Sequence, residues 1–232
     1  MKTISSIFLF SLFTTIFCGH GQAAIILTTA SGNGADSYVN FGSYQNTNFG
    51  SATSAQVVMG SANDYLRKAY LRFDLSSVTG PITEATLTFH FSSPNNATGG
   101  GPLKLYGLND GASGEDWLEN TINWTNAPAN AGGASLTADA TELANIPYVN
   151  STTATIEFTS EILSFVQADT DNYVTFIITG NGRSGGPVRG SVFTKEHATE
   201  IAPTLTIIPE PSTMVLLLLS LTTLICCRRR KE

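Results

Sequence analysis

Three polar side chains at alternate positions of one apolar segment have the chemistry to bind a sugar. Tyr70, Arg72 and Asp74 are separated by Leu71 and Phe73, so on a β-strand they project from one face. A tyrosine ring can stack on a pyranose, and an arginine can hold a uronate carboxylate by two parallel hydrogen bonds. The pattern predicts an exposed face for an acidic sugar, where Arg72→Ala weakens binding without unfolding the domain. An Arg72 salt bridge on a solvated face is the alternative.

Three further cations are candidates for the same ligand. Arg183 and Arg189 lie in the glycine-rich segment 180–190, and Lys195 follows it. Loops on a rigid scaffold carry binding residues, although ordinary hairpin loops have the same composition. Together with Tyr70 and Arg72, these cations are the predicted glycan-binding residues.

No arrangement of residues points to catalysis. A glycosidase needs two facing carboxylates, and a polysaccharide lyase needs a base beside a group that neutralises the uronate. His90 is a candidate base on the outward side of its segment, but a surface histidine is more often inert. The sequence has no nucleophile elbow, phosphate loop or metalloprotease helix motif. We therefore predict no enzyme activity, and a polysaccharide lyase is the less favoured alternative.

β-strands must position these side chains, because apolar and polar residues alternate along most of the chain. A helix is expected at 160–168, with Ser160 as its N-cap. Its apolar face would close one end of the fold through Ile162, Phe165 and Val166. The predicted strands are 55–59, 70–75, 87–91, 103–108, 154–158, 173–179, 191–194 and 204–208. The fold class is all-β, an antiparallel β-sandwich of jelly-roll type with one short helix.

The N-terminus has the pattern of a secretory signal. Lys2 precedes the apolar run 4–17, and small residues precede Ala24. This predicts a signal peptide over 1–23 that signal peptidase removes, and an exported domain over 24–208.

Residues 209–232 form a three-part tail. Pro209, Glu210 and Pro211 precede an apolar stretch at 212–227 and a basic run at 228–231. At ~1.5 Å per residue the stretch is roughly 24 Å long, so it would cross a ~30 Å hydrocarbon core only with local thinning or snorkelling. The tail resembles the PEP-CTERM sorting signal of Gram-negative bacteria, which implies removal by an exosortase and delivery to the cell surface or the exopolysaccharide matrix. A plain tail anchor is the alternative.

The exported part is acidic and lacks cysteine. Residues 24–208 hold seven basic and sixteen acidic residues, a net charge of −9, which argues against a nucleic-acid partner. With no cysteine and only His90 and His197, a disulfide framework and a Cys/His zinc site are excluded.

Carboxylates are the remaining candidate metal ligands, since hard oxygen atoms suit calcium. They are Asp36, Asp74, Asp110, Glu115 and Asp116. They show no EF-hand spacing, and an acidic loop such as 109–116 is usually solvated. We assign no metal and no cofactor, and a structural calcium is left open.

Seven short segments follow one another in a fixed order: 35–39 (ADSYV), 48–51 (NFGS), 69–76 (AYLRFDLS), 82–87 (ITEATL), 117–128 (WLENTINWTNAP), 193–196 (FTKE) and 202–205 (APTL). Together they resemble a DNRLRE domain, a family that overlaps carbohydrate-binding module family 96. The resemblance implies a jelly roll that binds an acidic polysaccharide such as alginate. It also implies that Trp117 and Trp124 are buried in a covering segment, and that Lys195 belongs to a structural pair.

The predicted function is therefore non-catalytic binding of an extracellular, acidic polysaccharide. The protein would be exported, transiently anchored in the inner membrane by 212–227, and released to the surface or the biofilm matrix. A structural matrix or adhesion protein that binds no sugar is the alternative.

Overall fold

The protein folds into two antiparallel β-sheets that share one strand. The computed structural model describes residues 23–60, 66–93, 103–133, 135–147, 149, 155–180 and 188–210. The smaller sheet contains β1 (Ile25–Thr28), β11 (Thr204–Pro209), β5 (Ile82–Ser93) and β8 (Thr155–Phe158). The larger sheet contains β10 (Val188–Phe193), β3 (Ser54–Met59), β4 (Arg67–Asp74), β2 (Ala35–Asn40), β9 (Tyr173–Gly180), β6 (Leu103–Leu108) and β7 (Ala140–Ile146).

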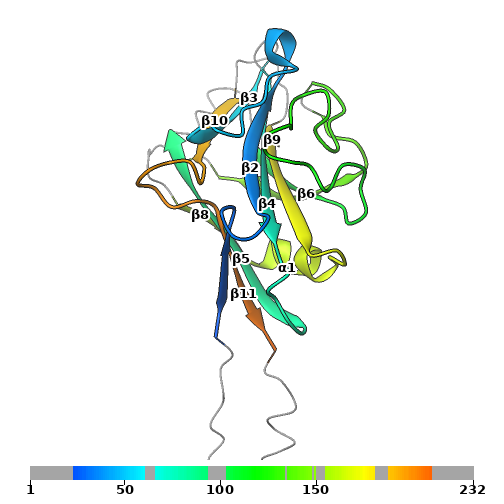
Figure 1. The fold of residues 1–232 in the computed structure, drawn as a ribbon, viewed down its shortest axis with the longest axis vertical. Helices are drawn as coiled ribbons and strands as arrows, with labels where there is room; N and C mark the ends of the chain where they lie inside the picture. The colour runs from blue at the N-terminus through cyan, green and yellow to red at the C-terminus, as the bar shows by residue number, and fades with distance from the viewer. Residues whose placement is uncertain are drawn as a thin grey trace, which may run out of the picture.

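Strand β5 joins the two sheets because it is long enough to pair on both (Figure 1). Its first part pairs with β11, and its last residues pair with β10, where the register shifts. Large apolar side chains from both sheets form one buried core. Within the larger sheet, Phe73 of β4 meets Phe176 of β9 edge-on at 5.9 Å between ring centres. The prediction of an all-β, antiparallel sandwich is confirmed, and the finer jelly-roll assignment stays a prediction.

Both faces of β4 are buried, which the alternating pattern did not predict. One face carries Ala69, Leu71 and Phe73 into the core. The opposite face, expected to be exposed, lies under segment 109–139, the connection between β6 and β7 (Figure 1, green). The prediction that Tyr70, Arg72 and Asp74 are exposed is therefore wrong, because alternation separates the faces of a strand without showing what covers each.

The one α-helix of the described residues, α1 (Ser160–Gln167), confirms the predicted helix at 160–168. Ile162 and Val166 are buried, and Phe165 lies over Gly107, where a Cβ would be 2.4 Å from the ring. The predicted cap is wrong: Thr159 holds the N-cap position without a side-chain hydrogen bond, and Ser160 is the first helical residue.

Three strands were missed by periodicity, for local reasons. β1 has only four residues, β2 is buried at all six positions, and β7 is rich in small and polar residues. None of the three shows a clear alternation over a long enough window.

The predicted signal peptide, apart from residue 23, and the tail beyond Glu210 lie outside the described residues. In the part of the chain that is described, no helix has the length and apolar character needed to cross a membrane. Pro209 of the predicted sorting motif is the last residue of β11, and the Glu210 N–H donates to the Pro81 carbonyl at 2.8 Å. The motif therefore begins directly at the end of the folded domain.

Candidate functional site

Tyr70 is a core residue and cannot stack on a sugar. Its side chain is fully buried, its ring meets Trp117 edge-on at 6.1 Å, and its hydroxyl donates to the Pro128 carbonyl at 3.1 Å. Burial raises the pKa of the Tyr70 hydroxyl. The residue anchors the covering segment on β4.

Arg72 has the same structural task. Its Nη2 and Nε donate to the Asn33 carbonyl at 2.8 and 3.2 Å, and its Nη1 donates to the Trp117 carbonyl. The guanidinium lies 5.1 Å from the Trp117 ring and 5.3 Å from the Tyr173 ring. Burial lowers the pKa of Arg72. Main-chain carbonyls accept these bonds, so neither predicted role, sugar binding nor a surface salt bridge, describes Arg72.

Lys68 completes the row of anchors, and the sequence reasoning missed it. Its Nζ donates to Asn130 Oδ1 at 2.7 Å and to the Ser135 carbonyl at 2.6 Å, and it lies 5.0 Å from the Trp124 ring. Burial lowers the pKa of Lys68 to about 7. Trp117 and Trp124 are both 6% exposed, as the family resemblance implied.

Arg189 is exposed and lines an open hollow, whereas Arg183 lies outside the described residues. The hollow has a volume of about 450 Å³ and crosses β3, β4, β5 and β10. We call it the arginine hollow; its lining residues are Gln56, Val58, Arg67, Ser92, Arg189, Gly190 and Ser191.

Strand register brings the two arginines together. Arg189 pairs with Val58 on β3, and Val58 pairs with Arg67 on β4. Arg67 Nη1 donates to Gln56 Oε1, while its Nε is buried and has no hydrogen-bond partner in the described part of the chain. Arg67 and Gln56 were not predicted, because this register, from strands far apart in the chain, is the only signal that links them to Arg189.

An aromatic pair follows the hollow along β10. Phe193 is four residues beyond Arg189, so regular alternation places the two side chains on one face, about 13 Å apart along the strand. The half-buried Phe193 ring lies 4.5 Å from the His197 ring. This face therefore offers cations at one end and an aromatic surface at the other.

Lys195 lies elsewhere, in an internal ion pair. Its Nζ is 2.6 Å from Glu119 Oε2 and donates to the Gly34 carbonyl at 3.3 Å. Its N–H donates to Asp36 Oδ2 at 3.0 Å. Lys195 therefore has a structural partner, which is Glu119 from the covering segment and not the adjacent Glu196, and its ammonium is engaged away from the arginine hollow.

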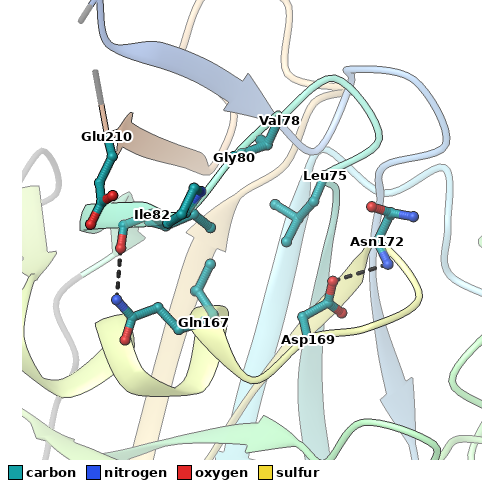
Figure 2. A pocket seen from close by; sticks show the side chains of 10 residues that line it. Leu75, Val78, Gly80, Ile82, Gln167, Asp169, Asn172 and Glu210 are labelled. Atoms are coloured by element: carbon teal, nitrogen blue, oxygen red, sulfur yellow. Dashed lines mark hydrogen bonds between the residues drawn. The ribbon is translucent and has the colours of Figure 1, made fainter. Parts of the chain in front are cut away.

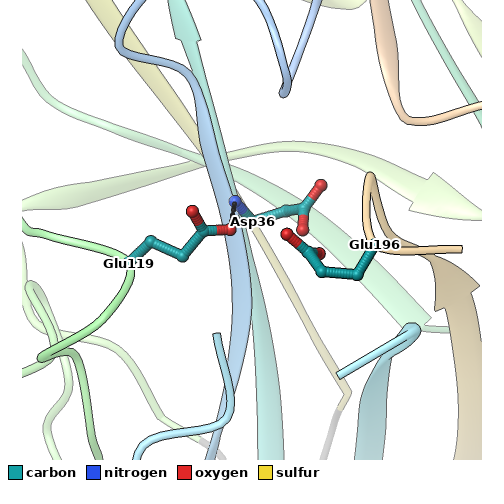
Figure 3. A group of neighbouring side chains, drawn as sticks. All are labelled: Asp36, Glu119 and Glu196. Atoms are coloured by element: carbon teal, nitrogen blue, oxygen red, sulfur yellow. Dashed lines mark hydrogen bonds between the residues drawn. The ribbon is translucent and has the colours of Figure 1, made fainter. Parts of the chain in front are cut away.

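Four of the segments that carried the resemblance meet around this pair. Asn48 Nδ2 donates to the carbonyls of Glu119 and Ile122 at 2.6 and 2.8 Å. Gly50 lies against the same chain, because a Cβ there would be 2.2 Å from the Glu119 carbonyl oxygen. Asp36, Glu119 and Glu196 form a carboxylate cluster beside them (Figure 3).

Electrostatics in the carboxylate cluster favour retained protons. Burial raises the pKa of Asp36, and burial together with the Asp36 charge raises the pKa of Glu196 to about 7. Burial also raises the pKa of Glu119, against the opposing effect of Lys195.

A second acidic group contains Asp110, Asp169 and Asp171. Burial raises the pKa of nearby Glu115 to about 7, and the charges of these three aspartates add to the effect. Of the other predicted calcium ligands, Asp74 accepts the N–H groups of Asn33 and Ser76, and Asp116 is exposed.

Another hollow, of about 390 Å³, lies between α1 and the start of β5 (Figure 2). Gln167 closes one side by donating to the Ile82 carbonyl at 2.7 Å, and Asp169 accepts the Asn172 N–H at 3.0 Å. Asp169 and Glu210 are its charged lining residues, and both are acids. This hollow does not suit a polyanion.

Comparison with known proteins supports a single family domain that includes both sheets and the segments that meet around Lys195. No curated protein matches the chain. The family model for carbohydrate-binding module family 96 matches residues 28–208, from the end of β1 to β11, and the chain belongs to that family.

Proposed function

We propose that this protein is a non-catalytic binder of an acidic polysaccharide, such as alginate, and that the glycan lies across the arginine hollow. Membership of a carbohydrate-binding family supports the ligand class. The observation that carries the choice of site is the placing of Arg67 and Arg189 in one open hollow with Gln56.

The chemistry of the hollow fits a uronate. The planar guanidinium of Arg189 can hold a carboxylate by two hydrogen bonds, which lysine cannot do. Gln56 and Ser191 line the same surface and can bond sugar hydroxyls. Phe193, further along β10, offers a flat apolar face for the next part of the chain.

Charge limits how this ligand is recognised. The net charge of −9 over 24–208 repels a polyanion at long range, so attraction must come from the local arginines. Both arginines are at least partly open to solvent, so dissolved salt weakens their attraction to the ligand; at 0.1 M ionic strength the screening length is about 10 Å. Binding should therefore weaken as salt increases.

The predicted signals at the two ends of the chain support a location outside the cell. A signal peptide over 1–23 would export the domain, and the tail at 209–232 would be removed by an exosortase after transient insertion of 212–227. The protein would then reach the cell surface or the biofilm matrix, where acidic polysaccharides occur.

The test is a binding screen of the purified full-length chain against alginate, pectin, xylan, cellulose and the host exopolysaccharide, with polymer cleavage followed in parallel. Saturable binding to an acidic polymer without cleavage is the expected result. Cleavage would instead establish an enzyme, and failure to bind any polymer would favour a structural matrix protein.

A further inference from the structure

We propose that Asp36, Glu119 and Glu196 bind a divalent cation of the calcium type, which joins three distant segments of the chain. Asp36 lies in β2, Glu119 in the covering segment, and Glu196 directly after β10. The proposal concerns a site separate from the arginine hollow and does not depend on glycan binding.

The spacing of the carboxylates fits an ion. One oxygen from each residue lies within 4.8 Å of the others. Calcium binds oxygen at about 2.3–2.6 Å, so two ligands on opposite sides of one ion are about 4.6–5.2 Å apart, and adjacent ligands are closer. One cation can therefore contact all three side chains with little movement.

Buried lone pairs without partners give independent support. Asp36 is fully buried, and its Oδ2 accepts bonds from the Thr29 hydroxyl and the Lys195 N–H. Asp36 Oδ1 and Glu196 Oε2 are also buried, and neither has a hydrogen-bond partner among the residues that the structure describes. Figure 3 shows the Asp36 and Glu196 carboxylates directed toward one another. A buried carboxylate oxygen without a partner is costly, and a cation would satisfy both.

Charge and ligand type select the kind of cation. Once a cation displaces the retained protons, the three ionised carboxylates and the Lys195 ammonium have a net charge of −2, which one divalent ion neutralises. All three side chains offer oxygen, and none offers sulfur or imidazole nitrogen, so a hard cation is favoured over zinc or copper. Calcium tolerates irregular oxygen sites better than magnesium does, because magnesium demands a near-ideal octahedron.

Glu119 adds a structural consequence. Its Oε1 accepts the Asp36 N–H at 3.3 Å at the free edge of β2, while its main chain packs on Gly50. A cation at the cluster would hold the covering segment to β2 and to the β10–β11 connection. We expect the bound cation to raise the melting temperature, since a ligand that binds only the folded state stabilises it.

The test uses the full-length chain after treatment with a chelator, titrated with calcium chloride by isothermal calorimetry and by thermal unfolding. We expect a dissociation constant no weaker than about 10⁻⁴–10⁻³ M, the range of extracellular calcium modules, and a melting temperature that rises with calcium. Glu196→Gln preserves shape, and it should weaken calcium binding at least about tenfold and remove the rise.

A matched control distinguishes this site from the second acidic group. Asp171→Asn removes one carboxylate from the Asp110 group and should bind calcium as the original chain does. The proposal is overturned if the original chain shows neither calcium binding nor a rise in melting temperature. It is also overturned if Asp171→Asn abolishes binding while Glu196→Gln does not. Asp36→Asn, read by calcium response and by circular dichroism of the folded state, repeats the test from β2.

Discussion

The Arg72 guanidinium lies 5.1 Å from the Trp117 ring and donates a hydrogen bond to the carbonyl of the same residue. A strand residue thus holds both the ring and the backbone of the covering segment. Four residues earlier on β4, Lys68 places its Nζ 5.0 Å from the centre of the Trp124 ring and donates hydrogen bonds to Asn130 and Ser135 of the same segment. Cations on β4 therefore serve to fasten segment 109–139 to the sheet.

Replacing Arg72 with Ala should destabilise the domain by about 2–4 kcal/mol, because the carbonyls of Asn33 and Trp117 would lose a charged donor in a buried site. Urea unfolding followed by tryptophan fluorescence measures this. Arg72→Lys should recover only part of the lost stability, since an ammonium group cannot reproduce the planar set of donors with which the guanidinium reaches both carbonyls. If the Arg72→Ala protein kept its stability but bound glycan more weakly, the structural role would be contradicted and a role of Arg72 in sugar binding would be supported.

Replacing Arg189 with Ala should weaken binding to an acidic polymer by about tenfold or more, because a charge-assisted hydrogen bond is lost from the arginine hollow. Affinity electrophoresis or calorimetry in low salt measures the change. Lys104→Ala is the control: it removes one cation from an exposed pair with Glu142 and changes the net charge equally. An equal effect of both variants would show that overall charge, not the hollow, controls binding.

Replacing Gly107 with Ala should destabilise the domain by about 1–3 kcal/mol, because the new methyl group would overlap the Phe165 ring of α1. Phe165 also packs on Phe176 at 5.5 Å, so it has little room to withdraw. The measurement is a double-mutant cycle with Phe165→Ala. The cost of Gly107→Ala should largely vanish once the ring is removed, and two strictly additive effects would contradict the contact.

Glu115 should make stability depend on pH. Its pKa is raised from 4.5 to about 7 by burial and by nearby aspartates, so the folded protein holds this proton more tightly than the unfolded chain. The contribution is fully present below about pH 4.5 and is lost as pH rises through about 7.

Glu115→Gln should therefore be more stable than the original chain above pH 7, by about 1 kcal/mol or ~2–4 °C, with a smaller difference near pH 4.5. A glutamine oxygen can still accept the Gly111 N–H that Glu115 accepts at 2.7 Å. Melting curves across this pH range measure the effect. Glu84→Gln, at an exposed position of β5, is the control. If both variants changed the melting temperature equally, burial of Glu115 would not be the cause of the pH dependence.

The strands and the helix could largely be read from the sequence. Strand β6 was predicted at 103–108, where the structure has it, and α1 differs from its predicted range by one residue. Membership of a carbohydrate-binding family was likewise carried by short ordered segments. These features depend on residues that are near one another along the chain, so local periodicity and spacing report them.

The candidate site could be predicted only in part. Arg189 was identified as a residue of a predicted loop, whereas the structure places it in β10. Arg67 becomes its neighbour only through the pairing of β4, β3 and β10. Tyr70 and Arg72 were given the wrong environment, because segment 109–139 has little regular structure and no period that could show where it packs.

Sequence alone determined the alternation of β4, its two faces and the strong tendency of this chain to form antiparallel strands. Tertiary structure decided which surfaces remain open, since burial depends on contacts between residues far apart, such as Tyr70 and Pro128. The same holds for Asp36 and Glu119, which are 83 residues apart yet share a hydrogen bond. Local preference selects the elements, and packing of distant segments selects the site.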